Sequence, residues 1–303
     1  MISVVCCCDS SFILPALVTI KSLSIATRGE RVKVFVITLR CDDRIRSFFD
    51  TGLDCDNLDV SVIACEESMF EGFPASDQYP DSVYLKLLAP LMVPDDIETL
   101  LYVDTDVLFL HSPAELFDLK SDGVIRAVPE LATPISFAGS IHGIKNHSSL
   151  GISGDTRLFN SGVMLIDITR WKALRMTEQA IDYCSVHGKD ILLYDQELLN
   201  ILLWNWWEEL GTEWNLTSNY YLSDAWADGL TPLERARIRE EAKIIHYTKI
   251  PKPWSASCRH PDVGEWRRVC SSLPDAVVTQ VRGLYKAPDP MLPGESDTFS
   301  SNW

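Results

Sequence analysis

Residues 100–106 read LLYVDTD, an apolar segment that runs straight into a pair of acids. The first four residues have the composition of a buried strand, and ionised carboxylates are rarely buried unless they are paired or bind a cation. Because side chains alternate along an extended chain, Asp104 and Asp106 should point to the same side, about 7 Å apart. Ligands in open α/β sheets bind beyond the carboxyl ends of the strands. We therefore expect an α/β sheet with a Mn²⁺ or Mg²⁺ site at the end of this strand.

Short apolar segments alternate with helical patterns on both sides of this stretch. The predicted strands are Ile2–Cys8, Val32–Leu39, Leu58–Ala64, Leu100–Val103, Val107–Leu110, Gly123–Val128, Phe159–Asp167 and Ala242–Tyr247. The predicted helices are Phe12–Ala26, Asp42–Asp50, Asp81–Met92, Thr169–His187 and Asp195–Trp204. This alternation is typical of a mostly parallel sheet with helices on both faces.

The charge of the chain limits its partners. It has 303 residues, with 43 acidic and 27 basic side chains, for a net charge of −16. Such a surface repels nucleic acids and anionic membranes, so we expect no nucleic-acid partner and at most peripheral contact with the inner face of the membrane. The sequence shows no signal peptide and no run of 18 apolar residues, which predicts a cytoplasmic protein. An anionic substrate would need a local cation cluster or a metal.

Two unusual clusters are expected to belong to the core. Cys6, Cys7 and Cys8 lie on a predicted strand without any C-x-x-C spacing, which favours small buried hydrophobes over a metal site. The aromatics of residues 204–207 (WNWW) are likewise expected to be buried rather than to form a ligand-binding platform. Three loops, Gly72–Pro80, Pro134–Asp155 and Thr248–Pro253, are expected to close over the substrate, the second being a lid or a disordered insert.

The acid pair admits several chemistries. The chain lacks both common backbone cradles for phosphate, G-x-x-x-x-G-K-[ST] and G-x-G-x-x-G. A divalent cation that bridges a diphosphate to two aspartates would serve in their place, which indicates a metal-dependent enzyme for a nucleoside diphosphate. Phosphatases of the haloacid-dehalogenase type follow their D-x-D with G-[TV], whereas Val107 and Leu108 follow Asp106 here. The residues therefore argue against that phosphatase chemistry.

Five blocks of sequence together resemble glycosyltransferase family 8, which includes bacterial lipopolysaccharide galactosyl- and glucosyltransferases and glycogenin. The blocks, in the order of the family, are Val4–Phe12, YLKL at 84–87 leading into VDTD at 103–106, FNSGVML at 159–165, YDQELLN at 194–200 and HYTKIPKPW at 246–254. The resemblance implies a GT-A fold, a Rossmann-like mixed sheet flanked by helices, over residues 1–255. A C-terminal helical extension and a flexible acidic tail would follow over residues 256–303.

The same resemblance implies an activity, namely retaining transfer of a hexose from a UDP-sugar to a hydroxyl of a saccharide or glycolipid acceptor. Glucose and galactose are the expected sugars, and Mn²⁺ is the usual metal of the family. Asp104, Asp106 and His246 match the metal ligands, and Lys252 matches the lysine that neutralises the departing diphosphate. The family often has glycine where this chain has Lys249, so that residue either adds a second cation or points away.

Further positions match the donor site of the family. Cys7, Asp9, Ser11 and Phe12 match residues that hold uracil and ribose, although Ser11 replaces a commoner asparagine. The other matched donor-site residues are Lys86, Thr105, Asn160, Ser161, Asp195 and Gln196, with Glu130 near the acceptor. Gln196 matches the residue nearest the reactive carbon, and an amide is a poor nucleophile. Double displacement through Gln196 and a same-face route assisted by the departing phosphate oxygen both remain open.

A non-catalytic function is the alternative. A nucleotide-sugar-binding protein that no longer turns over would keep the same metal ligands but release no UDP. The sequence fixes neither the transferred sugar nor the acceptor, the linkage or the oligomeric state.

Overall fold

The computed structural model describes residues 1–39, 41–70, 73, 84–132, 135–188, 191, 194–218, 231–249 and 251–284. The strands are β1 (Ile2–Cys8), β2 (Val32–Leu39), β3 (Leu58–Cys65), β4 (Thr99–Val103), β5 (Val107–Phe109), β6 (Ile125–Pro129), β7 (Phe159–Asp167), β8 (Trp207–Glu209), β9 (Leu216–Thr217) and β10 (Ile244–His246). The α-helices are α1 (Ile13–Ala26), α2 (Asp43–Asp50), α3 (Leu85–Met92), α4 (Ile168–Ala173), α5 (Met176–His187), α6 (Tyr194–Leu203), α7 (Pro232–Glu240), α8 (Val263–Cys270) and α9 (Asp275–Arg282).

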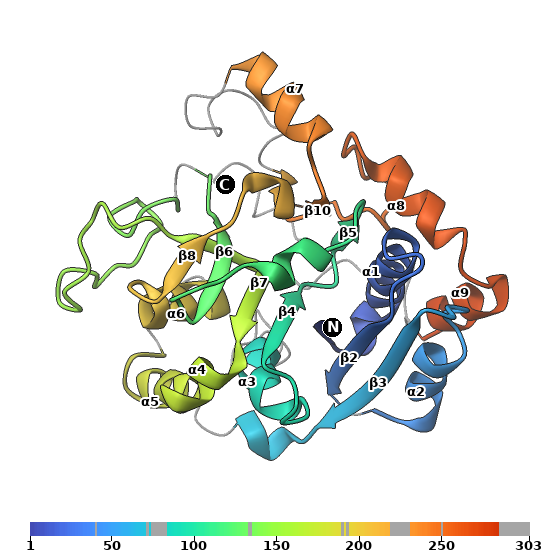
Figure 1. Ribbon diagram of the computed structural model, residues 1–303, viewed down its shortest axis with the longest axis horizontal. Coiled ribbons are helices and arrows are strands. Elements are labelled where there is room, and N and C mark those ends of the chain that lie inside the picture. The colour runs from blue at the N-terminus through green and yellow to red at the C-terminus, as the bar shows by residue number, and fades with distance from the viewer. Residues whose placement is uncertain are drawn as a thin grey trace.

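Most strands form one seven-stranded sheet in the order β3-β2-β1-β4-β7-β6-β8 (Figure 1). The β1, β2, β3 and β4 pairings and the β6–β8 pairing are parallel, whereas β7 is antiparallel to both of its neighbours. This confirms the mixed sheet. The sequence pattern did not reveal a second sheet of three strands, in the order β5-β10-β9, which begins directly after the acid pair.

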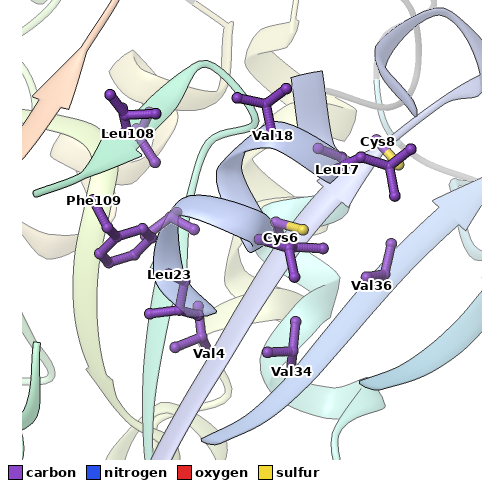
Figure 2. Close-up of a cluster of buried hydrophobic side chains, with 14 of the residues drawn as sticks. Val4, Cys6, Cys8, Leu17, Val18, Leu23, Val34, Val36, Leu108 and Phe109 are labelled. Atoms are coloured by element: carbon purple, nitrogen blue, oxygen red, sulfur yellow. The ribbon is translucent and has the colours of Figure 1, made fainter. Parts of the chain in front are cut away.

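The two faces of the large sheet bury separate apolar clusters, as period-two alternation requires. Figure 2 shows side chains of β1 and β2, among them Val4, Cys6 and Val34, on the face covered by Leu17 and Leu23 of α1. On the opposite face, intervening residues such as Val5 pack with α3, α4, α5 and α6. Helices thus cover both faces, as predicted.

The three adjacent cysteines occupy this core. Cys6 and Cys8 are buried, Cys7 is half-buried, and all nine cysteines of the chain are free thiols. Burial raises the pKa of the Cys6 thiol to about 12, so this side chain stays protonated at neutral pH. The prediction of small buried hydrophobes is confirmed for Cys6 and Cys8.

One helix prediction needs correction, and another is only partly described. The single helix predicted over Thr169–His187 is two helices, because Arg175 adopts a left-handed φ of 54° between α4 and α5. No glycine or proline marks this reversal, and it lets Trp171 and Met176 enter the same buried cluster. The helix predicted over Asp81–Met92 is described only from Tyr84 and is α-helical from Leu85. Residues 81–83 and all of the predicted loop Gly72–Pro80 except Phe73 lie outside the described residues.

The aromatic stretch at residues 204–207 differs from the expectation. Trp204 is 37% exposed and Trp206 is 46% exposed, because they lie in the turn between α6 and the edge strand β8. Only Trp207 packs inward, against Phe159. The expectation of a buried cluster was therefore wrong for Trp204 and Trp206.

The long polar segment before β7 is packed rather than extended. Between residues 135 and 158 it forms turns and a single bridge from Phe137 to Arg157. Ala138, Ile144 and Ile152 form a small apolar cluster that also includes Ile201 of α6. The described part is therefore an ordered irregular segment, and its closure over a substrate stays a prediction.

The C-terminal helices pack on the same side of the sheet as α1. Figure 1 shows α8 and α9 beside α1, and Trp266 and Val281 belong to the apolar cluster of that face. The predicted boundary near residue 255 stays a prediction, and the predicted acidic tail lies outside the described residues from position 285 on. Within the described part of the chain, no helix has both the length and the apolar composition to cross a bilayer.

Helix α1 holds the backbone of the acid pair in place. The Thr19 hydroxyl lies 2.8 Å from the carbonyl oxygens of both Thr105 and Val107. One turn later, the Ser22 hydroxyl donates to the Thr19 carbonyl oxygen and accepts from the Phe109 N–H. These buried hydroxyls therefore connect α1 to the segment that links the two sheets.

We expect Thr19→Val to lower the free energy of unfolding by about 1–3 kcal/mol, because it removes the hydroxyl that bonds to the buried backbone around the acid pair. Denaturant titration followed by circular dichroism would measure the loss. The matched control is Thr51→Val, where an exposed hydroxyl donates to the Ser47 carbonyl oxygen, and where a change within about 0.5 kcal/mol is expected. Equal losses in the two variants would contradict a special role for Thr19.

Candidate functional site

The candidate site lies where the two sheets meet. The parallel strands β1 and β4 end here, the antiparallel strand β7 begins here, and β5 leaves towards the small sheet (Figure 1). In the small sheet, His246 is paired with Val107, and the Tyr247 N–H donates to the Asp106 carbonyl oxygen. This ladder brings the end of β10 beside the acid pair, although 140 residues separate Asp106 from His246 in the sequence.

Asp104, Asp106 and His246 form a compact set of metal-ligating groups. One carboxylate oxygen from each acid and one ring nitrogen lie within 4.8 Å of one another. The His246 Nε2 atom is 3.2 Å from Asp106 Oδ1 and 3.7 Å from Asp104 Oδ2. Two carboxylate oxygens and an imidazole nitrogen suit Mn²⁺ and similar divalent ions. The structure thus brings together the three predicted metal ligands.

A glycine leaves room for this set. The Asp104 N–H donates to the Gly162 carbonyl oxygen, so β7 passes directly behind the acid. A Cβ atom on Gly162 would lie 2.1 Å from His246 Cε1 and 2.9 Å from Asp104 Oδ2. Any larger residue would therefore displace the imidazole, which explains in physical terms why the FNSGVML block carries glycine at this position.

Lysine side chains offset the charge of both acids. Lys252 Nζ is 2.6 Å from Asp106 Oδ2 and donates to the Tyr247 carbonyl oxygen at 2.7 Å. Burial by itself would raise the pKa of the Asp106 carboxyl, but Lys252 and His246 outweigh burial and hold that pKa well below its usual range. Asp106 is therefore ionised at neutral pH.

Lys86 offsets the charge of Asp104 from the other side of the site. Its ammonium lies 3.2 Å from Asp104 Oδ1 and 2.5 Å from Asp195 Oδ2, at the start of α6. Burial by itself would lower the pKa of Lys86, but Asp104 and Asp195 outweigh it and raise that pKa above its usual range. The Tyr102 hydroxyl adds a 2.7 Å hydrogen bond to Asp104 Oδ1. One buried cation thus joins the acid pair to the residues predicted to contact the sugar.

The predicted sugar-site residues lie close together at the start of β7 and α6. Gln196 Oε1 accepts from the Ser161 N–H at 3.2 Å, and the Ser161 hydroxyl lies 3.4 Å from Asp195 Oδ2. Asn160 Nδ2 and Gln196 Nε2 both donate to Glu130 Oε2, at 2.9 and 3.4 Å. The structure therefore gathers these residues into one hydrogen-bonded cluster, and their roles towards a sugar stay predictions.

The carboxylate of Glu130 accepts four hydrogen bonds from its neighbours. Its Oε1 atom accepts from the N–H groups of Leu131 and Ala132, while Oε2 receives the two amide groups just described. The side chain is only 3% exposed. A carboxylate with four donors is well suited to hold its neighbours in place.

The remaining predicted donor residues form a second part of the site. Asp9 Oδ1 accepts from the Ser11 N–H and caps a short 3₁₀ turn, and the Phe12 ring meets the Trp254 ring edge-on. Trp254 follows Lys252 by two residues, so this turn is tied to the lysine loop. The expected contacts with uracil and ribose stay predictions.

Cys7, Thr105 and Lys249 complete the predicted set. Cys7 is half-buried at the end of β1, and burial is the main cause that raises the pKa of its thiol. Thr105 is buried, with its carbonyl oxygen held by Thr19. Lys249 is half-buried, and burial lowers its pKa, opposed by the nearby charge of Glu130. Whether its ammonium contributes a second cation to the site stays a prediction. Ile250, within the predicted loop Thr248–Pro253, lies outside the described residues.

Three contributors to the site were not identified from the sequence. Tyr102 bonds to Asp104, Gly162 leaves space for the imidazole, and Asn215 Oδ1 lies 2.9 Å from His246 Nδ1. Asn215 looks in the sequence like part of an N-x-[ST] sequon, yet its side chain is fully buried. Only the fold brings it to the histidine, which lies 31 residues further along the chain.

Comparisons with known proteins agree with this geometry. The sequence profile of the family described as "Glycosyl transferase family 8" matches residues 3–258. General stress protein A of Bacillus subtilis is 26% identical over 208 residues, which cover 67% of this chain and 69% of that protein. A lipopolysaccharide 1,2-glucosyltransferase of Escherichia coli is 22% identical over 266 residues, which cover 88% and 76%.

The fold matches a solved structure as well. A crystal structure of the galactosyltransferase LgtC, in complex with donor and acceptor sugar analogs, superposes with a TM-score of 0.75 at 20% identity. The match covers 94% of this chain and all of that one. The predicted GT-A fold is thereby confirmed.

We expect Gly162→Ala to weaken Mn²⁺ binding by at least about tenfold, because the added methyl group occupies the space of the His246 ring. Isothermal titration with MnCl₂ would measure the affinity. The matched control is Gly264→Ala in α8, where an added Cβ meets no atom within 4 Å and Mn²⁺ affinity should be unchanged. Wild-type affinity in Gly162→Ala would show that the imidazole does not bind the ion.

Proposed function

Because this chain belongs to glycosyltransferase family 8, we propose that it transfers glucose or galactose from a UDP-sugar to a hydroxyl acceptor with retention of anomeric configuration. It is a hexosyltransferase by family and by its relatives. The nucleotide, the identity of the sugar, the stereochemical course and the choice of Mn²⁺ over Mg²⁺ are the parts that we propose.

The observation that carries the proposal is the set Asp104, Asp106 and His246 beside the buried Lys86 and the half-buried Lys252. The chain has a net charge of −16, so a diphosphate needs local positive charge to bind at all. A divalent ion at this set would neutralise charge on the departing diphosphate. Lys252 would contact the same diphosphate, because its ammonium already lies against Asp106 Oδ2.

The arrangement of Gln196 favours one of the two routes left open by the sequence. Its amide oxygen accepts from the Ser161 N–H and its amide nitrogen donates to Glu130, so the side chain is held in place at both ends. An amide held in this way is suited to orient a sugar and is a poor nucleophile. We favour the same-face route, in which the departing phosphate oxygen takes the proton of the acceptor hydroxyl. In that step the new C–O bond forms while the bond to UDP breaks.

The acceptor would approach from the side of Glu130 and Lys249. With four donors on its carboxylate, Glu130 would position Gln196 and Asn160 rather than remove a proton from the acceptor. We propose a saccharide or glycolipid as the acceptor, because a relative is a lipopolysaccharide 1,2-glucosyltransferase. We also propose a cytoplasmic location, with at most peripheral contact with the inner face of the membrane.

We expect UDP release from UDP-glucose or UDP-galactose to require Mn²⁺, and to fall about 10²–10³-fold in Asp106→Asn because a metal ligand is lost. A coupled assay for UDP, run with UDP-Glc, UDP-Gal, UDP-GlcNAc and UDP-GalNAc, would identify the donor. Asp118→Asn, which neutralises an exposed acid, is the control and should turn over normally.

The alternative function has its own outcome in this assay. A non-catalytic binding protein would bind the UDP-sugar with Mn²⁺, release no UDP with any donor, and show no difference between wild-type and Asp106→Asn in turnover. Full turnover in Asp106→Asn would instead show that the metal site is misplaced.

The stereochemical course is testable with water as the acceptor. Retention predicts that the α-linked sugar of UDP-glucose is released first as the α-anomer. Proton NMR of the anomeric region, recorded before the free sugar equilibrates, would measure it. Initial release of the β-anomer would contradict the same-face route and the double displacement alike.

A further inference from the structure

A line of buried hydrogen bonds runs from Glu130 to the imidazole of His246. Asn160 Nδ2 donates to Glu130 Oε2 at 2.9 Å, Asn215 Nδ2 donates to Asn160 Oδ1 at 2.9 Å, and Asn215 Oδ1 lies 2.9 Å from His246 Nδ1. The side chains along it are buried, from 0% exposed at Asn215 to 6% at Asn160. Solvent water therefore cannot replace a hydrogen-bond partner that is removed from this line.

Groups that can only donate or only accept a hydrogen bond determine which atom is the donor at each step of this line. An ionised carboxylate only accepts, so the Asn160 atom that faces Glu130 must be the amide nitrogen. The Gly162 N–H, which only donates, lies 3.1 Å from the other Asn160 atom and independently requires an oxygen there. Asn215 must then present its nitrogen to Asn160 and its oxygen to His246. Because that oxygen only accepts, the hydrogen of the bond must come from His246 Nδ1.

The direction decides which imidazole nitrogen is available. A neutral histidine with its proton on Nδ1 has its lone pair on Nε2, the atom that lies 3.2 Å from Asp106 Oδ1. Without an acceptor at Nδ1, the ring could instead carry its proton on Nε2 and donate it to Asp106. That tautomer has no lone pair to offer at the position between the two acids.

We propose that Asn215 is a positioning residue, which holds His246 as the Nδ1–H tautomer and so prepares Nε2 to ligate a divalent cation. The inference rests on the proposed metal site, but the tautomer itself is a property of the metal-free protein. Glu130 anchors the line and also receives Gln196 Nε2, so one carboxylate orders both the metal side and the sugar side of the site.

The tautomer is measured directly by NMR on protein labelled with ¹⁵N-histidine. Two-bond proton–nitrogen correlations distinguish a ring that carries its proton on Nδ1 from one that carries it on Nε2. The chain has six histidines, and the His246 signals are those missing from His246→Gln. We expect the wild type to carry the proton on Nδ1, Asn215→Asp to keep it there because a carboxylate oxygen still accepts, and Asn215→Leu to lose it.

Mn²⁺ titration of the same variants supplies the second readout. We expect the dissociation constant to rise about 10–100-fold in Asn215→Leu, the usual effect of losing a partner behind a metal-ligating histidine, and less than tenfold in Asn215→Asp. Asn57→Leu is the control, because Asn57 makes four hydrogen bonds to Ser24 and Thr27 far along the sequence from the site. It should lower the melting temperature without changing Mn²⁺ affinity or the His246 tautomer.

The outcomes separate the inference from the proposed function. An Nε2–H tautomer in the wild type, or wild-type Mn²⁺ affinity in a folded Asn215→Leu, would overturn the inference. If Asn215→Leu does not fold, the wild-type spectrum and Asn215→Asp decide. A wild type that carries the Nδ1 proton and yet binds no Mn²⁺ would leave the tautomer assignment standing and refute the metal site of the proposed function.

Discussion

Two aspartates at the end of a core strand create the electrostatic problem that the rest of the site answers. Asp104 and Asp106 lie beside each other in a chain that is acidic throughout, and Asp195 adds a third carboxylate. Lys86 and Lys252 supply the compensating charge from opposite sides. Like charges in such a confined space repel strongly, and these lysines offset that repulsion in the absence of a bound cation. Three carboxylates that face two lysines favour the binding of a further cation, even without a substrate.

The scaffold is arranged so that backbone, rather than long side chains, sets the distances in this site. Thr19 holds the carbonyl groups around the acids, and the β5–β10 ladder brings His246 to them. Gly162 leaves the space that the imidazole occupies. Because each of these contacts involves strands or a buried helix, the ligand atoms are held by elements that cannot shift without disturbing the core.

The sequence predicted those parts of the structure that depend on local pattern. The strand that leads into Asp104 and Asp106 is one such part, since a run of apolar residues and an abrupt pair of acids are both local signals. The break at Arg175 carries no glycine or proline and could not be seen. The small sheet was missed because its strands are short and because β5 and β10 pair residues that are more than 130 positions apart. Asn215 was missed for the same reason, because only tertiary structure brings it to His246.

The donor and acceptor directions of the buried amides limit which substitutions this site can tolerate. Glu130 and the Gly162 N–H fix both ends of Asn160, so neither amide can turn over without losing a hydrogen bond that water cannot replace. A substitution of Glu130 would therefore act at two places, on Gln196 beside the predicted sugar position and on His246 beside the acids. Under the proposed function, residues that line the acceptor side could vary with the acceptor, but Glu130 could not vary alone. Under the proposed function, acceptor specificity would then reside in residues other than this carboxylate.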